Sequence, residues 1–208
     1  MEVGKSKSAL LVVDVQNDFC EKGALPVTDG SAVVPIINSL RASSFIDYFI
    51  FTQDWHPVNH CSFKSYKPEE VPPGAGRPTT PGTWPSHCVA GEPGSDFPPE
   101  LDIRPEDISI KKGKVAYEDS YSAFCDKADK TYLKQILRNL NVTKVYVTGL
   151  AYDYCVRYTA EDAKKEGFDT YFIKDAAKAI SEEGIKETDE SLKKLGVHII
   201  TSSDILKK

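Results

Sequence analysis

Three segments of this 208-residue chain lead to side chains that could act together in covalent catalysis. The apolar run SALLVVD ends at Asp14, and the run ISIKKG carries Lys111 and Lys112. The segment KVYVTGLAYDYC leads from a strand-like pattern through small residues to Cys155. A thiol beside a carboxylate and an ammonium group has the components of an activated nucleophile. Such a group suits acyl transfer, most simply the hydrolysis of an amide or nitrile.

The sequence after Cys155 suggests how the thiol could be activated. The segment VRYTAEDAKKEG predicts a helix that ends at Gly167. At the N-terminus of that helix, the thiol would face unpaired N–H groups and the positive end of the helix dipole, which favour the thiolate. The alternative is a small buried residue that packs at a strand–helix junction. This segment alone leaves both explanations open.

A second group of side chains has the types and spacing of metal ligands. Asp54 and His56 are two residues apart in FTQDWHPVNH, and His87 follows in GTWPSHCV. Three protein ligands with open coordination positions are typical of a catalytic divalent metal. His60 is either a fourth ligand or a histidine outside the ligand set. Cys88 could also bind zinc, but a neighbour of His87 in extended chain points to the other side.

The hydrophobic pattern predicts a scaffold that would bring these residues together. Strands are expected over residues 8–14, 45–52, 108–110, 143–148, 170–173 and 197–201. Helices are expected over residues 31–42, 131–140, 156–166 and 182–195. This alternation is typical of an α/β protein with a doubly wound, six-stranded parallel sheet and helices on both faces. Ligands bind at the carboxyl ends of such strands, where the sequence places Asp14, Asp54 with His56, Lys111 with Lys112, and Cys155, so we expect these residues to form one site.

A proline-rich segment interrupts the alternation of strands and helices. Eleven of the 13 prolines lie between Pro57 and Pro105. The segment has too few apolar residues for a core of its own, so we expect a single domain over residues 1–208. Long irregular loops in compact domains usually have a function. We therefore expect residues 55–106 to form a lid and metal-binding loop at the edge of the active site.

The composition argues against several classes of protein. The net charge is −5 and no cluster of Lys and Arg is present, which argues against a nucleic-acid partner. No apolar run approaches the roughly 20 residues of a membrane span, and the N-terminal apolar run is too short for a signal peptide. Five cysteines without regular spacing indicate reduced thiols, so we expect a cytoplasmic protein.

Five segments occur in an order that carries a family resemblance. They read VVDVQNDFC, DWHPVNHCSF, WPSHCVAG, KKGKVAYEDSYSAF and VTGLAYDYCV. Together they resemble the nicotinamidase (pyrazinamidase) branch of the isochorismatase-like cysteine hydrolases. The resemblance implies a six-stranded parallel sheet and the hydrolysis of nicotinamide to nicotinate and ammonia through a cysteine thioester. It also implies a place in NAD salvage.

The resemblance assigns catalytic roles to specific residues. It implies a triad of Asp14, Lys112 and Cys155, and it excludes Lys111 because the family's lysine is followed directly by glycine. It also implies a cis peptide bond before Ala151. The backbone N–H groups of Ala151 and Cys155 would then form the oxyanion hole. Apart from the resemblance, we expect Asp153 to cap the helix that follows Cys155.

The resemblance also implies a metal site and a substrate slot. Asp54, His56 and His87 would hold one divalent ion, usually zinc but in some members manganese or iron, and His60 is not generally a ligand. The pyridine nitrogen of the substrate would bind the metal and place the carboxamide at the thiolate. The positions that match the family's aromatic slot are Phe19, Leu25, Trp84, Tyr121 and Tyr154. For Phe19 and Tyr121 plain core packing is the alternative.

One departure from the family pattern and three rival functions remain at this point. The run VPPGAGRPTTPGTW looks like an insertion in the lid, which puts the approach of His87 in question. The rival enzymes are a vinyl-ether hydrolase of the isochorismatase type and an amidase for carbamoyl or other small amides. The third rival is a non-catalytic zinc-binding module, which would leave Asp14 and Lys112 unexplained. The oligomeric state is open, and a homo-oligomer is one alternative.

Overall fold

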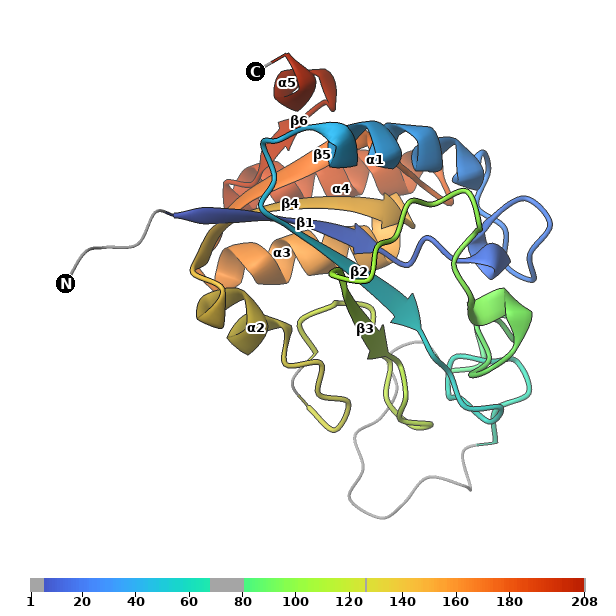
Figure 1. Ribbon diagram of the computed structural model, residues 1–208. Helices are drawn as coiled ribbons and strands as arrows, with labels where there is room; N and C mark the ends of the chain where they lie inside the picture. Colours follow the sequence, from blue (N-terminus) through green and yellow to red (C-terminus); the bar gives the residue numbers. More distant parts are fainter. Residues whose placement is uncertain (1–5, 68–80, 126, 208) are drawn as a thin grey trace.

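A single parallel sheet organises the protein (Figure 1). The computed structural model describes residues 6–67, 81–125 and 127–207. The six strands are hydrogen-bonded in the order β3-β2-β1-β4-β5-β6, and every neighbouring pair is parallel. Their bounds are β1 Lys7–Val13, β2 Tyr48–Asp54, β3 Ile108–Lys112, β4 Val142–Leu150, β5 Asp169–Lys178 and β6 His198–Ile200. The predicted sheet is confirmed.

The second strand begins later than the sequence pattern predicted. The expected strand starts at Phe45, whereas β2 starts at Tyr48. Hydrogen bonds to a side chain, instead of the backbone hydrogen bonds of the sheet, hold the chain before β2. The carboxylate of Asp47 accepts hydrogen bonds from the Ser8 N–H at 2.8 Å and the Lys7 ammonium at 2.7 Å.

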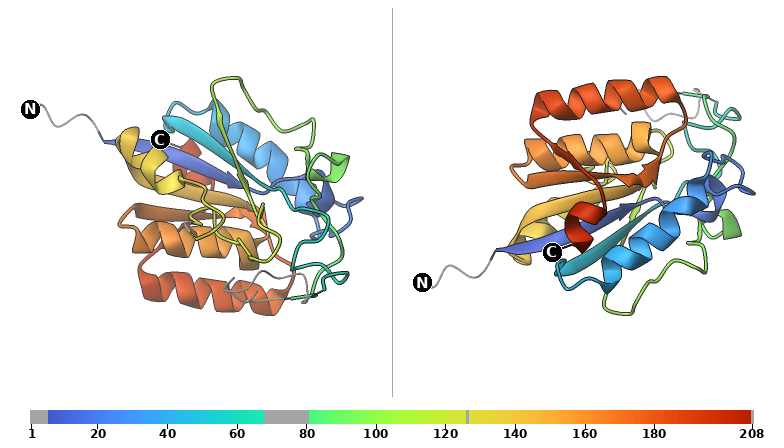
Figure 2. Two further views of the ribbon diagram at one scale, coloured as in Figure 1. Left: turned by 90° about the horizontal axis from the view of Figure 1, so that it is seen from below. Right: turned by 90° about the horizontal axis from the view of Figure 1, so that it is seen from above.

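Helices cover both faces of the sheet (Figure 2). Their bounds are α1 Val33–Ala42, α2 Leu133–Asn139, α3 Arg157–Lys165, α4 Glu182–Leu195 and α5 Ser203–Leu206. The helices α1 and α5 pack on one face, and α2, α3 and α4 pack on the other. The longest of them, α4, begins where the Ser181 side chain accepts a hydrogen bond from the Gly184 N–H. It ends at Gly196, whose φ of 75° is favourable for glycine.

The central strand β1 explains why the core has two halves. Ala9, Leu11 and Val13 belong to the hydrophobic cluster under α2, α3 and α4, whereas Leu10 and Val12 belong to the cluster under α1. Successive side chains of a strand point to opposite faces, so a continuous apolar run supplies both clusters. Full burial of a leucine side chain contributes roughly 1.5–3 kcal/mol, which makes this strand a major source of stability.

The strands β1 and β4 approach each other closely at their carboxyl ends. Gly149 is paired with Val13 and has a φ of 118°. A Cβ atom at Gly149 would clash with the carbonyl oxygen of Val13. Only glycine fits this position, and the chain segments that carry Asp14 and Cys155 leave the sheet directly after it.

The predicted lid is irregular in its described part. Residues 55–67 and 81–106 form no strand of the sheet, and they contain two isolated bridges and a short 3-10 turn at Pro93–Ser95. Most of the run VPPGAGRPTTPGTW, up to residue 80, lies outside the described residues. Whether the chain has a single domain over residues 1–208 stays a prediction.

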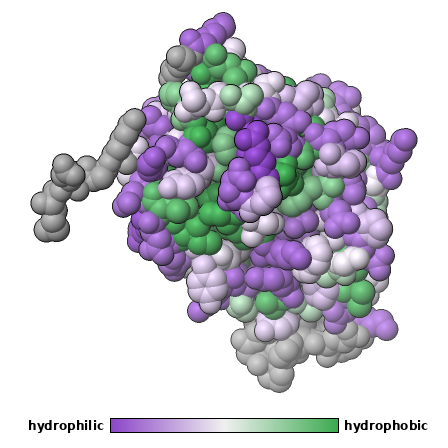
Figure 3. All heavy atoms as spheres, viewed as in Figure 1, coloured by the Kyte–Doolittle hydropathy of each residue, from purple (hydrophilic) through white to green (hydrophobic). Residues whose placement is uncertain are grey.

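Surface and cysteine chemistry agree with the composition. The face shown in Figure 3 is largely hydrophilic, with apolar side chains in patches between the polar ones. In the part of the chain that the structure describes, no helix is long and apolar enough to cross a membrane. All five cysteines are free, as their irregular spacing predicted.

Candidate active site

The carboxyl edge of the sheet gathers the four side chains that the topology was expected to bring together. Asp14 follows β1, Asp54 and Lys112 are the last residues of β2 and β3, and Cys155 follows β4. The register of the sheet pairs Asp54 directly with Lys112. Parallel strands end at the same edge, so residues far apart in the sequence become neighbours here.

A fully buried ammonium group connects these side chains. Lys112 Nζ lies 2.8 Å from Asp14 Oδ2 and donates a hydrogen bond to Asp54 Oδ1 at 2.6 Å. It also donates to the carbonyl oxygen of Ser120 at 3.0 Å and lies 3.4 Å from Cys155 Sγ. The side chain of Lys112 has no exposed surface. A buried cation requires such partners, because burial of an unpaired charge costs several kcal/mol.

The neighbouring lysine lies outside this cluster. Lys111 is exposed, and its ammonium lies over the ring of Trp55, 3.2 Å from the centroid. Adjacent residues of a strand point to opposite sides, so only one of the two lysines can face the site. The structure places Lys112 there, in agreement with the glycine that follows it in the sequence.

A threonine that the sequence analysis did not identify holds Asp14 in place. Thr52 Oγ1 donates a hydrogen bond to Asp14 Oδ1 at 2.6 Å, and the Asp14 N–H donates to the Thr52 carbonyl oxygen at 3.2 Å. Asp14 has a φ of 49°, a conformation that aspartate tolerates better than most residues. The only sequence signal for Thr52 is its place near the carboxyl end of a strand.

The two carboxylates around Lys112 differ in pKa. Burial raises the pKa of Asp14 above its usual 3.8, Asp54 adds to this, and Lys112 opposes it. For Asp54 burial acts in the same direction, but Lys112 and His56 outweigh it and hold the pKa well below the usual range. Asp54 therefore keeps its negative charge, and Asp14 is the more basic of the two.

The thiol of Cys155 is protonated in the resting cluster. Burial and the nearby carboxylates of Asp14 and Asp54 raise its pKa well above 9.0, although Lys112 acts in the opposite direction. Cys155 does not begin α3 but lies in an irregular helical turn, η5 (Tyr152–Val156), that precedes the helix. The direction of this pKa shift is opposite to the thiolate that a helix N-terminus would favour.

The three predicted metal ligands lie together on the same side of the pocket. One candidate ligand atom from each of Asp54, His56 and His87 lies within 4.8 Å of the others, and all three residues are buried. His56 Nδ1 is 2.9 Å from the Gly113 carbonyl oxygen, and His87 Nδ1 is 2.8 Å from that of Pro85. Carbonyl oxygens only accept hydrogen bonds, so Nδ1 carries the proton in both rings and leaves Nε2 for a metal.

The donor chemistry fits a divalent ion. Burial, with a contribution from His56, lowers the pKa of His87 to about 4, so its imidazole is neutral at physiological pH. His56 Nε2 lies 3.5 Å from Asp54 Oδ2. One carboxylate and two imidazoles leave open coordination positions on a divalent metal, as in catalytic zinc sites. The residues present therefore fit the predicted metal site.

Backbone pairing brings His87 to the ligand set despite the long loop. The His56 N–H donates to the Cys88 carbonyl oxygen at 3.0 Å, and the Ala90 N–H donates to the His56 carbonyl oxygen at 2.9 Å. The thiol of Cys88 is buried in the hydrophobic cluster under α1 and is not part of the ligand set. Cys88 therefore lies apart from the ligand set as expected, although its φ of 46° shows that the chain is not extended there.

His60 supports the ligand set by packing. Its ring stacks on that of His56 with 4.0 Å between centroids. Its Nδ1 lies 2.8 Å from Ser62 Oγ and its Nε2 lies 3.2 Å from the Glu118 carbonyl oxygen. Burial, with a contribution from His56, lowers its pKa to about 3. Since both ring nitrogens have protein partners, the structure favours a packing role for His60.

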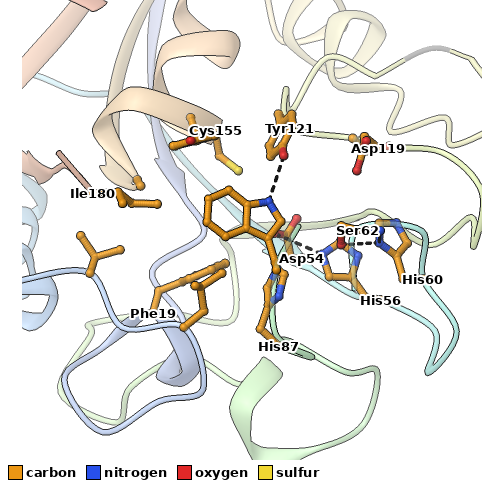
Figure 4. A pocket seen from close by; sticks show the side chains of 16 residues that line it. Phe19, Asp54, His56, His60, Ser62, His87, Asp119, Tyr121, Cys155 and Ile180 are labelled. Carbon is orange, nitrogen blue, oxygen red and sulfur yellow. Dashed lines mark hydrogen bonds and ion pairs between the residues drawn. The ribbon is translucent and has the colours of Figure 1, made fainter. Parts of the chain in front are cut away.

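A pocket lined by aromatic side chains opens on Cys155 and on the three predicted metal ligands (Figure 4). Trp84 Nε1 donates a hydrogen bond to the Tyr121 hydroxyl at 3.1 Å, and its ring packs edge-on against Tyr154 with 5.3 Å between centroids. All five predicted slot residues line this pocket, namely Phe19, Leu25, Trp84, Tyr121 and Tyr154. Five further residues that the sequence did not point to also line the pocket, namely Val27, Ser62, Asp119, Ser120 and Ile180.

The backbone of the turn after β4 also reaches the pocket. Ala151 lines it, and the Leu150–Ala151 peptide bond is cis, as the resemblance implied. Asp153 does not cap α3, so that prediction is wrong. Its carboxylate accepts hydrogen bonds from the N–H groups of Ile180 at 3.0 Å and Ser181 at 3.2 Å. The turn separates Asp153 from α3. The hydrogen bonds of Asp153 instead link the residues at the start of α4 to the segment that carries Cys155.

Fold and site together define a doubly wound α/β protein with a buried Asp–Lys–Cys cluster, and comparison with known proteins identifies the family. Residues 8–204 match the isochorismatase domain, and the chain belongs to that family. A nicotinamidase of Acinetobacter baylyi is 40% identical over 203 residues, which are 95% of this chain and 94% of that protein. These findings confirm the resemblance seen in the five segments.

Two solved structures extend the comparison. The nicotinamidase/pyrazinamidase of Acinetobacter baumanii has a TM-score of 0.84 at 38% identity, with 97% of this chain and 99% of that chain covered. The pyrazinamidase of Pyrococcus horikoshii in complex with zinc has a TM-score of 0.78 at 35% identity, with 94% and 99% covered. The sheet, the helices on both faces and the chain length are thus similar throughout.

Proposed function

We propose that this protein is a metal-dependent amidase that hydrolyses nicotinamide to nicotinate and ammonia. One observation carries the proposal: Cys155, which is backed by the buried Lys112–Asp14 pair, lines the same aromatic pocket as Asp54, His56 and His87. The nicotinamidases and pyrazinamidases among its relatives support the choice of substrate. We place the reaction in NAD salvage in the cytoplasm.

The first half of the reaction forms a thioester. Cys155 Sγ attacks the carboxamide carbon, and its proton passes to Asp14, the more basic carboxylate of the cluster. The C–N bond of the tetrahedral intermediate then breaks, and Asp14 returns the proton to the leaving nitrogen, so that ammonia departs. Lys112 keeps its positive charge throughout, because Asp14 and Asp54 raise its pKa well above the usual value despite its burial.

The second half releases the acid and restores the thiol. Asp14 takes a proton from a water molecule, which attacks the thioester carbon, and the C–S bond breaks. Asp14 passes its proton to the thiolate of Cys155, and the acid leaves and ionises to nicotinate by losing its proton to water. In both halves we assign the negative oxygen of the tetrahedral intermediate to the backbone N–H groups of Ala151 and Cys155.

The metal set would orient the substrate. Asp54, His56 and His87 would hold one divalent ion, for which we propose zinc, and the zinc complex of the Pyrococcus horikoshii relative supports this choice. When bound, the ion supplies an electrophilic anchor for the ring nitrogen of a pyridine. Trp84 and Tyr154 supply apolar faces for the flat ring, and such a slot with few polar anchors suits a small heteroaromatic amide.

Ammonia release from nicotinamide tests the proposal. The wild-type protein should release ammonia, and Cys155→Ala should release none while it still binds nicotinamide. Cys20→Ala is the matched control, because Cys20 is half-buried outside the pocket and should leave turnover unchanged. Turnover by Cys155→Ala would disprove the assignment of the nucleophile.

Elemental analysis tests the metal set separately. His56→Ala should lose bound zinc together with activity, whereas His198→Ala, at the exposed edge strand β6, should keep both. Full zinc occupancy in His56→Ala would disprove the metal assignment. If the wild type binds zinc but hydrolyses only carbamoyl or other small amides, the substrate assignment is wrong. If it hydrolyses none, the protein is a zinc-binding module.

A further inference from the structure

Asp129 carries a buried carboxylate that lies outside the pocket. It forms a hydrogen bond to the backbone of Gly113, the residue that follows Lys112 and contacts His56. We propose that Asp129 is a positioning residue that fixes the backbone at Gly113, and through it both Lys112 and His56. The inference builds on the proposed function, but its metal half can be measured without any catalytic assay. Neither the five family segments nor the pocket includes Asp129.

The contacts of Gly113 form a short relay. The Gly113 N–H donates a hydrogen bond to Asp129 Oδ2 at 2.5 Å, and the Gly113 carbonyl oxygen accepts one from His56 Nδ1 at 2.9 Å. The hydrogen bond to a carboxylate is charge-assisted and stronger than one between neutral groups. One residue thus links the carboxylate of Asp129 to the ring whose Nε2 faces Asp54.

Gly113 has to be glycine at this position, so a contact from another residue must restrict its backbone. Its φ is 66°, and a Cβ atom there would clash with the ring of His56. Glycine is therefore required for the close approach of His56, but a glycine has more conformational freedom than any other residue. The hydrogen bond to Asp129 restricts that freedom where the direction of the Gly113 carbonyl sets the tautomer and orientation of His56.

The same anchor acts on the catalytic lysine. The N–H that Asp129 binds belongs to the peptide bond directly after Lys112, and the carbonyl oxygen of Lys112 accepts the Trp55 N–H at 2.8 Å. Both sides of this peptide are therefore fixed. Lys112 is the last residue of β3, where the sheet no longer holds the chain beyond it. A shift here would move its ammonium relative to Asp14.

The hydrogen bond from the Gly113 N–H is the main contact of the Asp129 carboxylate, because its ion pair contributes little. Its side chain is fully buried, and the cation paired with it is Lys114, 3.2 Å away and 41% exposed. A surface ion pair of this kind contributes about 0–1 kcal/mol, too little to explain a buried carboxylate. The hydrogen bond to Gly113 is the contact that connects Asp129 to the site.

Three variants distinguish the hydrogen-bonding role of Asp129 from an effect of its negative charge and from a general loss of protein stability. Asp129→Ala removes the acceptor, Asp129→Asn keeps an oxygen that can accept the Gly113 N–H, and Lys114→Ala removes only the surface ion pair. We expect Asp129→Ala to weaken zinc binding about 10–100-fold, as for other groups that orient metal ligands. Its kcat for nicotinamide should fall with little change in KM. Asp129→Asn should recover most of the zinc affinity, and Lys114→Ala should match the wild type.

Zinc affinity is measured by competition with a chromogenic chelator, and circular dichroism gives the folded fraction of each variant. Wild-type affinity in folded Asp129→Ala overturns the inference, as does equal weakening in Asp129→Ala and Asp129→Asn. If Asp129→Ala does not fold, Asp129→Glu replaces it, since it keeps the charge but displaces the acceptor. Asp129→Glu should then bind zinc more weakly than Asp129→Asn, and the reverse order overturns the inference. A wild type that binds zinc without releasing ammonia disproves the proposed function alone.

Discussion

Replacement of Lys112 by methionine removes the ammonium group that lies between two buried carboxylates, Asp14 and Asp54. The lysine contacts Asp14 at 2.8 Å and Asp54 at 2.6 Å, and the side chains of all three are nearly or fully buried. Methionine has a similar length and fills much of the same volume, so the loss of packing should be small. The expected effect is therefore electrostatic.

The size of the effect follows from the burial. Removal of one partner from a buried ion pair costs about 3–5 kcal/mol, because the remaining charge is left uncompensated. In Lys112→Met two carboxylates would remain without a cation, and their pKa values in the folded state would rise above the usual 3.8. Groups with a raised folded pKa stabilise the fold at low pH and lose that contribution as the pH rises. The loss should therefore be largest at pH 7 and smaller at pH 5.

Urea unfolding of the metal-free protein at both pH values measures this effect. Lys111→Met is the matched control, because it removes an adjacent lysine that is exposed over Trp55. A cation–π contact at an exposed site is worth under about 1 kcal/mol. The reasoning is refuted if Lys112→Met is no less stable than Lys111→Met at pH 7, or if its deficit does not shrink at pH 5.

Three further predictions concern single contacts. Gly149→Ala should yield insoluble or strongly destabilised protein, because its Cβ would clash with the Val13 carbonyl oxygen, and a normal melting temperature would contradict this. Ser191 and Arg157 lower the pKa of Glu161 below 4.5 although burial opposes them, so Glu161→Gln should lower the melting temperature at pH 7 but not at pH 3. Tyr121→Phe removes the acceptor of the Trp84 N–H, a loss of about 1 kcal/mol that should raise KM about fivefold at nearly unchanged kcat.

The sequence by itself determined the architecture and most of the site. Continuous apolar runs such as residues 8–13 can only be satisfied by burial on both faces, and alternation with helices requires parallel strands. Once the strands are parallel, Asp14, Asp54, Lys112 and Cys155 must lie at one edge. The local pattern near each strand end therefore contained the position of the site.

Tertiary structure decided the properties that depend on neighbours from distant segments. Thr52 and Asp129 have no local pattern that marks them, because their partners Asp14 and Gly113 lie 38 and 16 residues away. Asp153 binds the start of α4 instead of its own helix for the same reason. Such contacts form only when the chain folds.

The charge state of the site was also decided by the fold. The sequence places the thiol of Cys155 at a helix terminus, which would favour a thiolate, and it leaves a plain packing role as the alternative. In the structure, burial and two carboxylates outweigh Lys112 and raise the pKa of Cys155, which favours the protonated thiol. A pKa depends on the water that is excluded and on the charges within a few ångströms. Both are properties of the packed structure, and no segment of the sequence contains them alone.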